Sequence, residues 1–416
     1  MIFWALPAMS PTVKLSWATL SSSVIGDMQK ELNDYGIRVH PHLKEIAAKD
    51  WDGLLFQQHS PTPFMRHAYL LALQDSSSAV AATGWQAQFI SLWRGDELVG
   101  ACPLYLKDHS YGEYVFDWAW ANAYHQHGLN YYPKALIAVP FTPVPGSRLL
   151  AKDASSRELL LQAVIGWCQE QKLSSLHMLF GSDEDMAASQ TLGLLHRQTV
   201  QFHWQNQAWP DFDTFLASLT QEKRKKIRQE RRRVTDAGVS FRWSLGADIS
   251  EEDWTFFYQC YERTYLEHGN APYLKPDFFH RMKADMAENW LMFIAEREGR
   301  PIASSLIGVH SHGTESAVAY GRYWGALERV DCLHFEACYY QPLQWCIAHG
   351  VNRFEGGAQG EHKMARALMP VSTHSAHWLA DPRFANAVEQ FLEREGSGVD
   401  NYLAHLDERN PFKRTT

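Results

Sequence analysis

The sequence predicts an α/β fold made of two similar lobes, each with a mixed central sheet flanked by helices. An internal repeat carries this prediction. Residues 89–106 are typical of a β-hairpin with its turn at residues 94–96, and residues 293–307 repeat that layout without a gap. A second repeated unit is a helix ending in Trp167-Cys168 or Trp345-Cys346 that leads into a short apolar strand. Chance similarity of short apolar strings is the alternative, but a repeat of this size indicates one folded unit present twice.

Length and composition agree with two domains. The length of 416 residues is more than one ordinary domain needs, and a hydrophobic content of 45% can bury a large core. We expect an N-terminal appendage over residues 1–35 and a first lobe with an aromatic-rich insert over residues 36–205. The second lobe, residues 206–416, should contain a basic helix and a C-terminal extension.

Charge, cysteine usage and hydropathy limit the class of protein. The formal net charge of −8 argues against a protein whose whole surface coats nucleic acid, and we expect no DNA partner. The six cysteines contain no CxxC pair, and the apolar first nine residues are too short to span a bilayer. We therefore expect a soluble, cytoplasmic protein with reduced thiols, no stable membrane insertion and no tightly bound cofactor.

The segment 115–134 in the first lobe is dense in aromatic rings with polar tips. Such side chains suit a groove that stacks on a ligand and hydrogen-bonds to it, and core packing is the alternative. The substrate-binding residues predicted here are Trp118, Trp120, Asn122, Tyr124, His125, Tyr131 and Tyr132. The spacing of His125 and His127 could mimic a metal pair, but no third ligand follows at a recognisable distance, so we predict no metal site.

Residues 222–233 contain eight basic and two acidic residues on a predicted helix. A phosphate-rich partner such as tRNA would be attracted by Coulomb steering and counterion release. The predicted nucleic-acid-binding residues are Lys223, Arg224, Lys226, Arg228, Arg231 and Arg232. A solvated helix that leads into the second lobe is the alternative.

A strand-to-helix junction is predicted in the second lobe. Residues 319–325 should end a strand, and residues 333–340 should open a helix with Asp331 as its N-cap. Pro342 should kink that helix or split it in two. The free N–H groups of a helix N-terminus favour phosphate, although Glu336 would place a carboxylate nearby. The substrate-binding residues predicted in this region are Arg322, Trp324, His334, Tyr339 and Tyr340.

Residues 353–366 form the segment most typical of a reaction site. A predicted strand runs into Gly356-Gly357, which permits close backbone approach, and Glu, His, Lys and Arg side chains follow within one or two helical turns. Gly356, Gly357, Gln359 and Arg366 are predicted to contact the substrate. A glycine-rich turn beside a charged helix start is the alternative.

These segments resemble the FemAB-like (peptidoglycan biosynthesis/recognition) branch of the GNAT acyltransferase superfamily. Residues 111–120, 320–325, 333–336, 338–341 and 354–366 carry the resemblance, which extends from about residue 37 to residue 410. It implies two tandem GNAT-like lobes. It also implies an acyl-CoA or aminoacyl-tRNA donor and an amine on a peptidoglycan precursor or peptide as acceptor.

The sequence departs from the family pattern at two places. Pro342 stands where a glycine is more usual, and the glycine-rich Q/R-x-x-G-x-G/A loop that holds the acyl donor in GNAT folds is missing before residue 333. The second departure argues against ordinary acetyl-CoA binding.

Acyl transfer to an amine needs a base, stabilisation of the tetrahedral oxyanion and a proton for the leaving group. The residues predicted to be catalytic are Glu336, Tyr323, Glu355, His362 and Lys363. Glu336 or Glu355 would be the base, with His334 and His362 as further candidates. Tyr323 would be the acid, and Lys363 or Arg366 would hold the oxyanion or a donor phosphate. The rival hypothesis is a non-catalytic protein that recognises a cell-wall peptide or sugar on the same scaffold.

Overall fold

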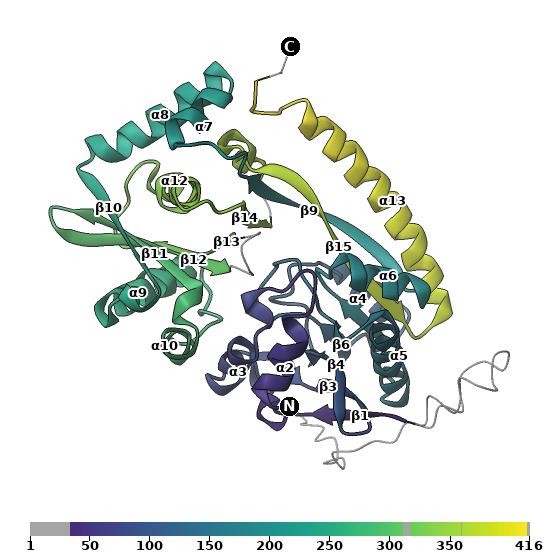
Figure 1. Cartoon of the computed structure of the whole chain (residues 1–416). Coiled ribbons are helices and arrows are strands. Elements are labelled where there is room, and N and C mark those ends of the chain that lie inside the picture. Colours follow the sequence, from purple (N-terminus) through teal and green to yellow (C-terminus); the bar gives the residue numbers. More distant parts are fainter. Residues whose placement is uncertain (1–33, 311–316, 359, 414–416) are drawn as a thin grey trace.

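The computed structural model describes residues 34–310, 317–358 and 360–413. Two α/β lobes share an 11-stranded mixed sheet, and a further four-stranded sheet belongs to the first lobe (Figure 1). Most of the expected appendage, residues 1–35, lies outside the described residues. The domain limits drawn from the sequence stay a prediction.

The first lobe runs from β1 to β9. Its strands are β1 (Tyr35–His40), β2 (Gln86–Ala87), β3 (Phe89–Arg94), β4 (Glu97–Cys102), β5 (Leu104–Lys107), β6 (Lys134–Ile137), β7 (Leu150–Ala151), β8 (Ser175–Met178) and β9 (Leu195–Gln205). Its helices are α2 (Ala48–Leu55), α3 (His67–Asp75), α4 (Trp118–Gln126), α5 (Ala154–Glu170) and α6 (Asp183–Thr191).

The second lobe follows with a short helix, a longer helix and a second mixed set of strands. Its strands are β10 (Val239–Leu245), β11 (Trp290–Arg297), β12 (Arg300–His310), β13 (Val318–Ala326), β14 (Arg353–Ala358) and β15 (Met369–Leu379). Its helices are α7 (Phe212–Ser218), α8 (Gln221–Asp236), α9 (Glu251–Glu267), α10 (Pro276–Asp285), α11 (Leu333–Phe335), the π-helix η7 (Glu336–Tyr340), α12 (Gln341–Ala348), the 3-10 helix η8 (Glu361–Arg366) and α13 (Pro382–Asp407).

The predicted repeat is confirmed by the strand topology. The two hairpins form as β3–β4 and β11–β12, and β1 and β10 pair with them at corresponding positions. Gly95 and Gly299 turn the hairpins with φ of 58° and 72°, a conformation that glycine adopts without steric cost. Each lobe then places a helix before a strand that pairs in parallel, giving the pairs β6–β8 and β13–β14.

The two lobes exchange their last strands. Strand β9 follows β8 in the chain but pairs with β14 of the second lobe, while β15 follows β14 and pairs with β8 of the first lobe. The two exchanged strands also pair with each other in the middle of the long sheet. Helix α13 lies along β9 and β15 (yellow in Figure 1), so the C-terminal extension packs over the seam between the lobes.

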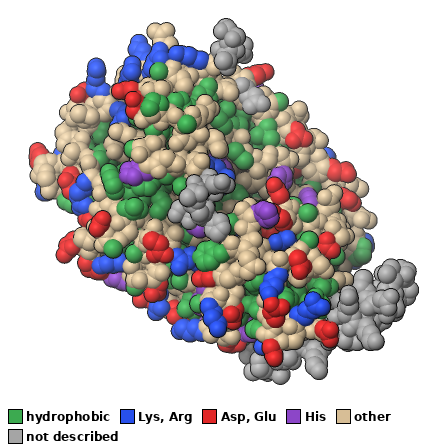
Figure 2. Space-filling view, in the orientation of Figure 1, with side chains coloured by type: hydrophobic (Ala, Val, Ile, Leu, Met, Phe, Trp, Pro, Cys, Tyr) green, Lys and Arg blue, Asp and Glu red, His purple; other side chains and the backbone are tan. Residues whose placement is uncertain are grey.

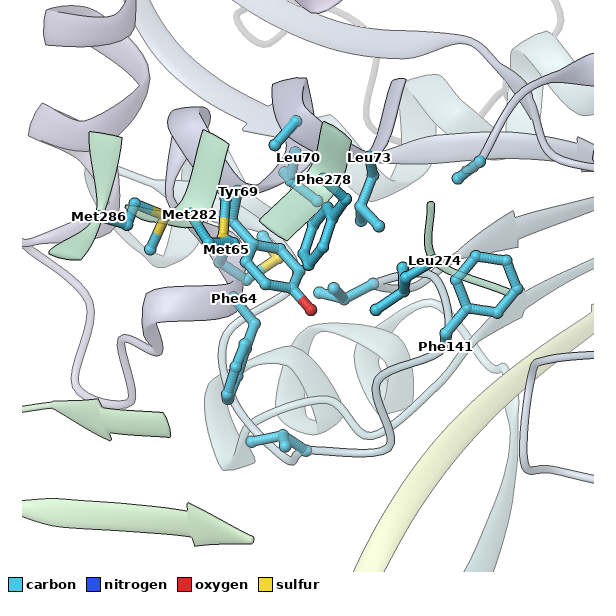
Figure 3. Close-up of a cluster of buried hydrophobic side chains, with 14 of the residues drawn as sticks. Phe64, Met65, Tyr69, Leu70, Leu73, Phe141, Leu274, Phe278, Met282 and Met286 are labelled. Atoms are coloured by element: carbon cyan, nitrogen blue, oxygen red, sulfur yellow. The ribbon is translucent and has the colours of Figure 1, made fainter. Parts of the chain in front are cut away.

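A hydrophobic core joins the lobes beside the long sheet. Phe64 and Tyr69 of the first lobe pack in one cluster with Phe278 and Met282 of the second (Figure 3). Their rings meet edge to face, with centroids 5.3 Å apart for both Phe64–Tyr69 and Tyr69–Phe278. Burial of large rings across an interface contributes strongly to its stability, so the space between the lobes has fixed walls.

The helix that contains Pro342 departs from the sequence prediction at its start. Asp331 is not the N-cap, because Cys332 holds that position with φ of 64° and no side-chain cap hydrogen bond. A π-helical turn precedes Pro342, but the backbone stays helical through Tyr340 and Gln341 into α12, so the helix is not split in two, and the predicted kink stays a prediction. In the part of the chain that the structure describes, no helix combines the length and apolarity needed to cross a bilayer.

Candidate functional site

The parallel strands β13 and β14 separate after three residue pairs, the last of which is Tyr320 with Glu355. Each strand has a β-bulge at this point. Arg322 is the extra residue of β13 against β12, and the register of β14 against β9 shifts across Gly356-Gly357. Bulges bend strands and redirect side chains, so the end of this strand pair opens into a space that side chains from both strands can reach.

The glycines at this opening are required by close packing. A Cβ on Gly356 would lie 2.3 Å from Leu368 Cδ2, and one on Gly321 would lie 3.2 Å from Phe354 Cζ. Gly357 has a φ of 76°. The paired glycines predicted to allow close approach therefore do so against the protein's own core as well as at the cavity wall.

A cavity of about 480 Å³ lies between the lobes at this opening. Its wall combines aromatic rings with few other polar groups: Ser110, Tyr111, Gly112, Tyr114, Phe116, Trp118, Phe141 and Pro143 from the first lobe, and Tyr261, Tyr265, Tyr273, Leu274, Gly321, Arg322, Tyr323, Gly356 and Gly357 from the second. Of the described residues on this wall, Arg322 alone carries a charge.

A smaller cavity of about 140 Å³ adjoins the first one on the side of α11 and η7. Its wall includes Ser305, Ile307, Trp324, His334, Cys338, Tyr339 and Phe354. It shares Gly321, Arg322, Tyr323 and Gly356 with the larger cavity, so the two meet where the strands separate. A third cavity of about 390 Å³ shares Trp324 and His334 with the small one and includes Arg263 and Arg329.

Hydroxyl groups from both lobes surround the Arg322 guanidinium. Its Nη2 donates to the carbonyl oxygen of Phe141 at 3.1 Å, to Thr142 Oγ1 at 3.1 Å and to Tyr323 Oη at 3.3 Å. Tyr69 Oη lies 3.2 Å from Thr142 Oγ1 and 3.5 Å from Tyr323 Oη. This polar cluster borders the larger cavity through Arg322 and Tyr323, and Tyr69 joins it to the apolar core of Figure 3.

The family model of the FemAB-like proteins, described as peptidoglycan biosynthesis/recognition, matches residues 42–414. The chain belongs to this family. L-PGS from Bacillus licheniformis is similar in structure, with a TM-score of 0.50, 11% identity and coverage of 83% of this chain and 97% of its own. FemX covers 83% of this chain and 98% of its own at 12% identity and a TM-score of 0.49. A tandem GNAT protein from the clavulanic acid biosynthesis pathway covers 84% of this chain and 99% of its own, at 11% identity and a TM-score of 0.44. 

These identities show a shared fold alone, and that fold is the tandem GNAT-like α/β arrangement that the sequence predicted. A search of curated proteins gives no significant match. 

The two carboxylates predicted as bases, Glu336 and Glu355, line none of the three cavities described above. Glu336 Oε1 lies 3.0 Å from Arg231 Nη2 and accepts a hydrogen bond from Gln341 Nε2 at 2.8 Å. Glu355 Oε1 lies 2.9 Å from Arg353 Nη2, and burial raises the pKa of its carboxyl to about 7. Because both are paired behind the cavity walls, neither has the position of a base that touches substrate.

His334, the further candidate for the base, lies on a cavity wall, whereas Glu336 and Glu355 do not. It lies in α11 on the wall shared by the second and third cavities, with its ring centroid 5.5 Å from that of Trp324. Burial lowers the pKa of the imidazole to about 4, so the ring is neutral near pH 7 and can accept a proton. Tyr323 and Tyr339 place their side chains on the same wall.

The basic side chains of η8 contact the glycine bulge of β14 and the helices next to the opening. Lys363 Nζ donates to the Gly357 carbonyl oxygen at 3.0 Å, and burial lowers the pKa of Lys363 to about 8. The Arg366 guanidinium lies 3.5 Å from the Phe335 ring centroid and 2.8 Å from Glu230 Oε2. His362 Nε2 lies 3.4 Å from Tyr339 Oη. Lys363 and Arg366 therefore contact the glycine bulge and helix α8, and the roles predicted for them from the sequence stay predictions. Gln359 lies outside the described residues.

Tyr340 holds η7 to α8 rather than a ligand. Its side chain is 1% exposed, and its hydroxyl donates a hydrogen bond to Glu230 of α8. We therefore no longer expect Tyr340 to contact the substrate.

The aromatic insert divides between the cavity and the core. Trp118 lines the larger cavity, so ligand contact by this ring stays a prediction. Trp120, Tyr124 and Tyr131 instead pack in a buried cluster with Phe384 of α13. Asn122 and His125 are exposed on α4 away from the cavity wall, and Tyr132 Oη lies 2.8 Å from Ser110 Oγ. We therefore no longer expect ligand contacts from these six residues.

The cavity also includes aromatic residues that the sequence reading missed. Tyr261 and Tyr265 of α9 line it, together with Tyr273 in the loop that follows. The spacing of the first two by four residues is typical of a buried helix face, so periodicity alone favoured the core. Across residues 34–310, 317–358 and 360–413, no group of three His, Cys, Asp or Glu side chains is placed to hold a metal ion.

The basic helix α8 has an inward and an outward face. Ile227, Glu230 and Val234 are buried, and Arg231 joins them through its ion pair with Glu336. The predicted nucleic-acid-binding residues Lys226, Arg228 and Arg232 are exposed, and Lys223 and Arg224 are partly exposed. Figure 2 shows Lys and Arg side chains gathered along the upper edge of the molecule, over α8.

Proposed function

We propose that this FemAB-like protein transfers an acyl or aminoacyl group to an amine of a peptidoglycan precursor or peptide. The observation that carries the proposal is the opening between β13 and β14, where the two cavities meet at Gly321 and Gly356. A donor in the smaller cavity and an acceptor in the larger one would bring their reacting atoms together there. Holding two reactants in such a geometry is a major source of rate enhancement.

The groups around the opening suit the chemistry of amide formation. The acceptor nitrogen attacks the donor carbonyl carbon, a C–N bond forms, and the bond to the leaving sulfur or oxygen breaks. Neutral His334 would take the proton from the attacking nitrogen, which is much more acidic after attack than before. Tyr323 Oη would return a proton to the leaving group, and the backbone of β13 beyond Tyr320, which does not pair with β14, would face the oxyanion.

The donor is aminoacyl-tRNA or acyl-CoA, and the outward face of α8 supports the tRNA. Lys226, Arg228 and Arg232 present an exposed row of cations to a phosphate backbone. Arg263 and Arg329 of the third cavity would lie near the end of the donor that enters the small cavity.

The rival proposal is a non-catalytic protein that recognises a cell-wall peptide or sugar. One observation favours it. Among the described residues, no Asp or Glu lines the two cavities that meet at the opening, so the site lacks a carboxylate base. Ligand binding without transfer from any donor would support this rival.

The test measures turnover with a panel of aminoacyl-tRNAs and acyl-CoAs and a panel of amine acceptors, in the wild type and in Gly321→Val. The valine methyl groups should fill the opening, and we expect transfer to fall about 100-fold because reacting groups displaced by about 1 Å react that much more slowly. Gly36→Val is the matched control, since a Cβ on Gly36 of β1 meets no atom within 4 Å. Full turnover in a folded Gly321→Val protein would exclude this route.

A further inference from the structure

The positive charge of Arg322 has no carboxylate partner among the residues that the structure describes. Other arginines near the site do have one, since Arg231 pairs with Glu336 and Arg366 pairs with Glu230. The three protein acceptors of Arg322 are neutral oxygens. A guanidinium withdrawn from water without a counterion costs free energy that an anionic ligand would offset.

The three nitrogen atoms of the Arg322 guanidinium differ in their hydrogen bonds to the protein. All three protein acceptors lie on Nη2, while Nε is buried without a hydrogen-bond partner among the described residues. Nη1 also has no hydrogen bond to a described residue, but it is not buried, so a ligand in the cavity can reach it. A carboxylate is a preferred acceptor for a guanidinium. Nη1 is therefore the donor that a bound carboxylate would satisfy.

The position of Arg322 in the strand directs it to the opening. It is the extra residue of the bulge that shifts the β12–β13 register between Leu306 and Ile307. As a result it lines both the larger and the smaller cavity, beside Gly321. A ligand held by Arg322 would have its neighbouring atoms at the passage through which the proposed transfer occurs.

The rest of the wall indicates how much charge the ligand carries. Arg322 is the one charged side chain among the described residues that line the larger cavity. A diphosphate carries several negative charges and is usually held by several cations or a metal ion. One guanidinium neutralises one carboxylate, so the wall favours a ligand with a single carboxylate at this place.

The rim favours an apolar or planar group next to that carboxylate. Tyr111 and Trp118 are 61% and 53% exposed at the cavity mouth, and exposed rings of this size commonly mark a binding surface. Deeper in the cavity, Phe141 of the first lobe and Tyr273 of the second stack with centroids 4.6 Å apart. Both lobes thus supply flat surfaces around the single cation.

We propose that the cavity between the lobes binds the acceptor through one carboxylate, held by Arg322, with an apolar or planar part against the aromatic rim. The assignment of this ligand as the acceptor rests on the proposed function. The binding step itself needs no turnover, so it can be tested separately.

The test uses hippurate and hippuramide, which share an aromatic ring and differ by the carboxylate. Ligand-observed NMR titrations should show hippurate binding to the wild type at least about tenfold more tightly than hippuramide. Arg322→Met should weaken hippurate by about the same factor and leave hippuramide unchanged. Arg300→Met is the matched control and should change neither, because Arg300 lies at the β11–β12 hairpin, lines none of the three cavities and pairs with Glu298.

Several results would overturn the proposal. Equal affinity of the wild type for both probes, undetectable hippurate binding, or full hippurate affinity in Arg322→Met would each do so. Stronger displacement of hippurate by inorganic pyrophosphate than by acetate would exclude the single-carboxylate ligand. If Arg322→Met does not fold, the comparison of the two probes on the wild type and on Trp118→Ala decides. Transfer activity that fails while hippurate binding survives would remove the proposed function and leave the carboxylate site in place.

Discussion

In the first lobe the parallel pair β6–β8 adjoins a buried cluster of mutually neutralising charges, whereas in the second lobe the corresponding pair β13–β14 separates around two cavities. Lys134 Nζ, at the start of β6, lies 2.8 Å from Glu113 Oε2 and also donates to Asp117. Tyr131 Oη donates to Asp117 Oδ2 at 2.6 Å and lies 3.0 Å from His177 Nε2 on β8. The first lobe thus closes its strand pair with internal partners.

The difference shows how one duplicated unit can serve two purposes. The charges of the Lys134 cluster are all buried and partnered, and the segment that carries Glu113 and Asp117 also carries the rim rings Tyr111 and Trp118. The first lobe therefore holds the aromatic rim in place. The second lobe has glycines where its strands separate and, among the residues that the structure describes, Arg322 has no acidic partner. The proposed reaction lies at this place.

The largest effect should come from removing the buried lysine of the first lobe, and removal of Arg322 in the second lobe is the comparison. Lys134→Met leaves the buried carboxylates of Glu113 and Asp117 without their lysine, and breaking a buried ion pair in this way costs about 3–5 kcal/mol. Arg322→Met leaves no acidic group behind, so we expect a loss of about 1 kcal/mol. Urea unfolding of both variants measures the two losses. Equal losses would mean that Arg322 is a structural clamp between the lobes.

The duplicated fold could be read from the sequence because its signals are local. Gly95 and Gly299 mark hairpin turns, and Trp167 and Trp345 mark helix ends before buried strands. The exchange of β9 and β15 could not be predicted, because alternating side chains identify a strand and leave its partner open. Partner choice here depends on packing between segments far apart in the chain.

The site residues named from the sequence stay predictions, but the structure shows which of them line the cavities. The glycines and Arg322 fall at the opening, because strand ends and glycine pairs are local features. The ion pair that holds Glu336 outside the cavity walls could not be predicted, because its partner Arg231 is distant in sequence. Trp120 and Tyr124 could have been assigned to the core, since their spacing of four residues places them on one helix face.

The second effect concerns two carboxyl groups, one in each region, that keep their protons to unusually high pH. Burial raises the pKa of Glu355 and that of Glu113 to about 7, from an ordinary value of 4.5. Between pH 4.5 and about pH 7 these carboxyl groups are protonated in the folded state and ionised in the unfolded state. The free energy of unfolding therefore falls as the pH rises through this range, and it levels off above about pH 7. Each group contributes at most about 3 kcal/mol to that fall.

Glu355→Gln should remove the contribution of the second lobe. The unfolding free energy of the wild type minus that of the variant should decrease from about pH 5 to about pH 8, and urea titrations across that range measure it. His203 lies 3.9 Å from Glu355, but burial lowers its pKa to about 3, so it stays neutral throughout. Glu113→Gln provides the same comparison in the first lobe. A difference that does not change with pH would show that Arg353 keeps Glu355 ionised.

The smallest effect on stability should come from the outward face of α8, where the same contrast between paired and open charges recurs within one helix. Arg231 is tied to Glu336 and Gln344, so Arg231→Gln should lower the unfolding free energy by about 1 kcal/mol, a value reduced by partial exposure to solvent. Changing Lys226, Arg228 and Arg232 together to Gln should alter the free energy of unfolding by no more than about 0.5 kcal/mol.

The same triple variant should bind tRNA more weakly. The steepness of log affinity against log salt concentration should fall by about two to three, because each phosphate contact that is lost means about one counterion fewer released on binding. Filter binding at several salt concentrations measures this slope, and unchanged tRNA affinity in the triple variant would identify α8 as a solvated helix that anchors the second lobe through Arg231.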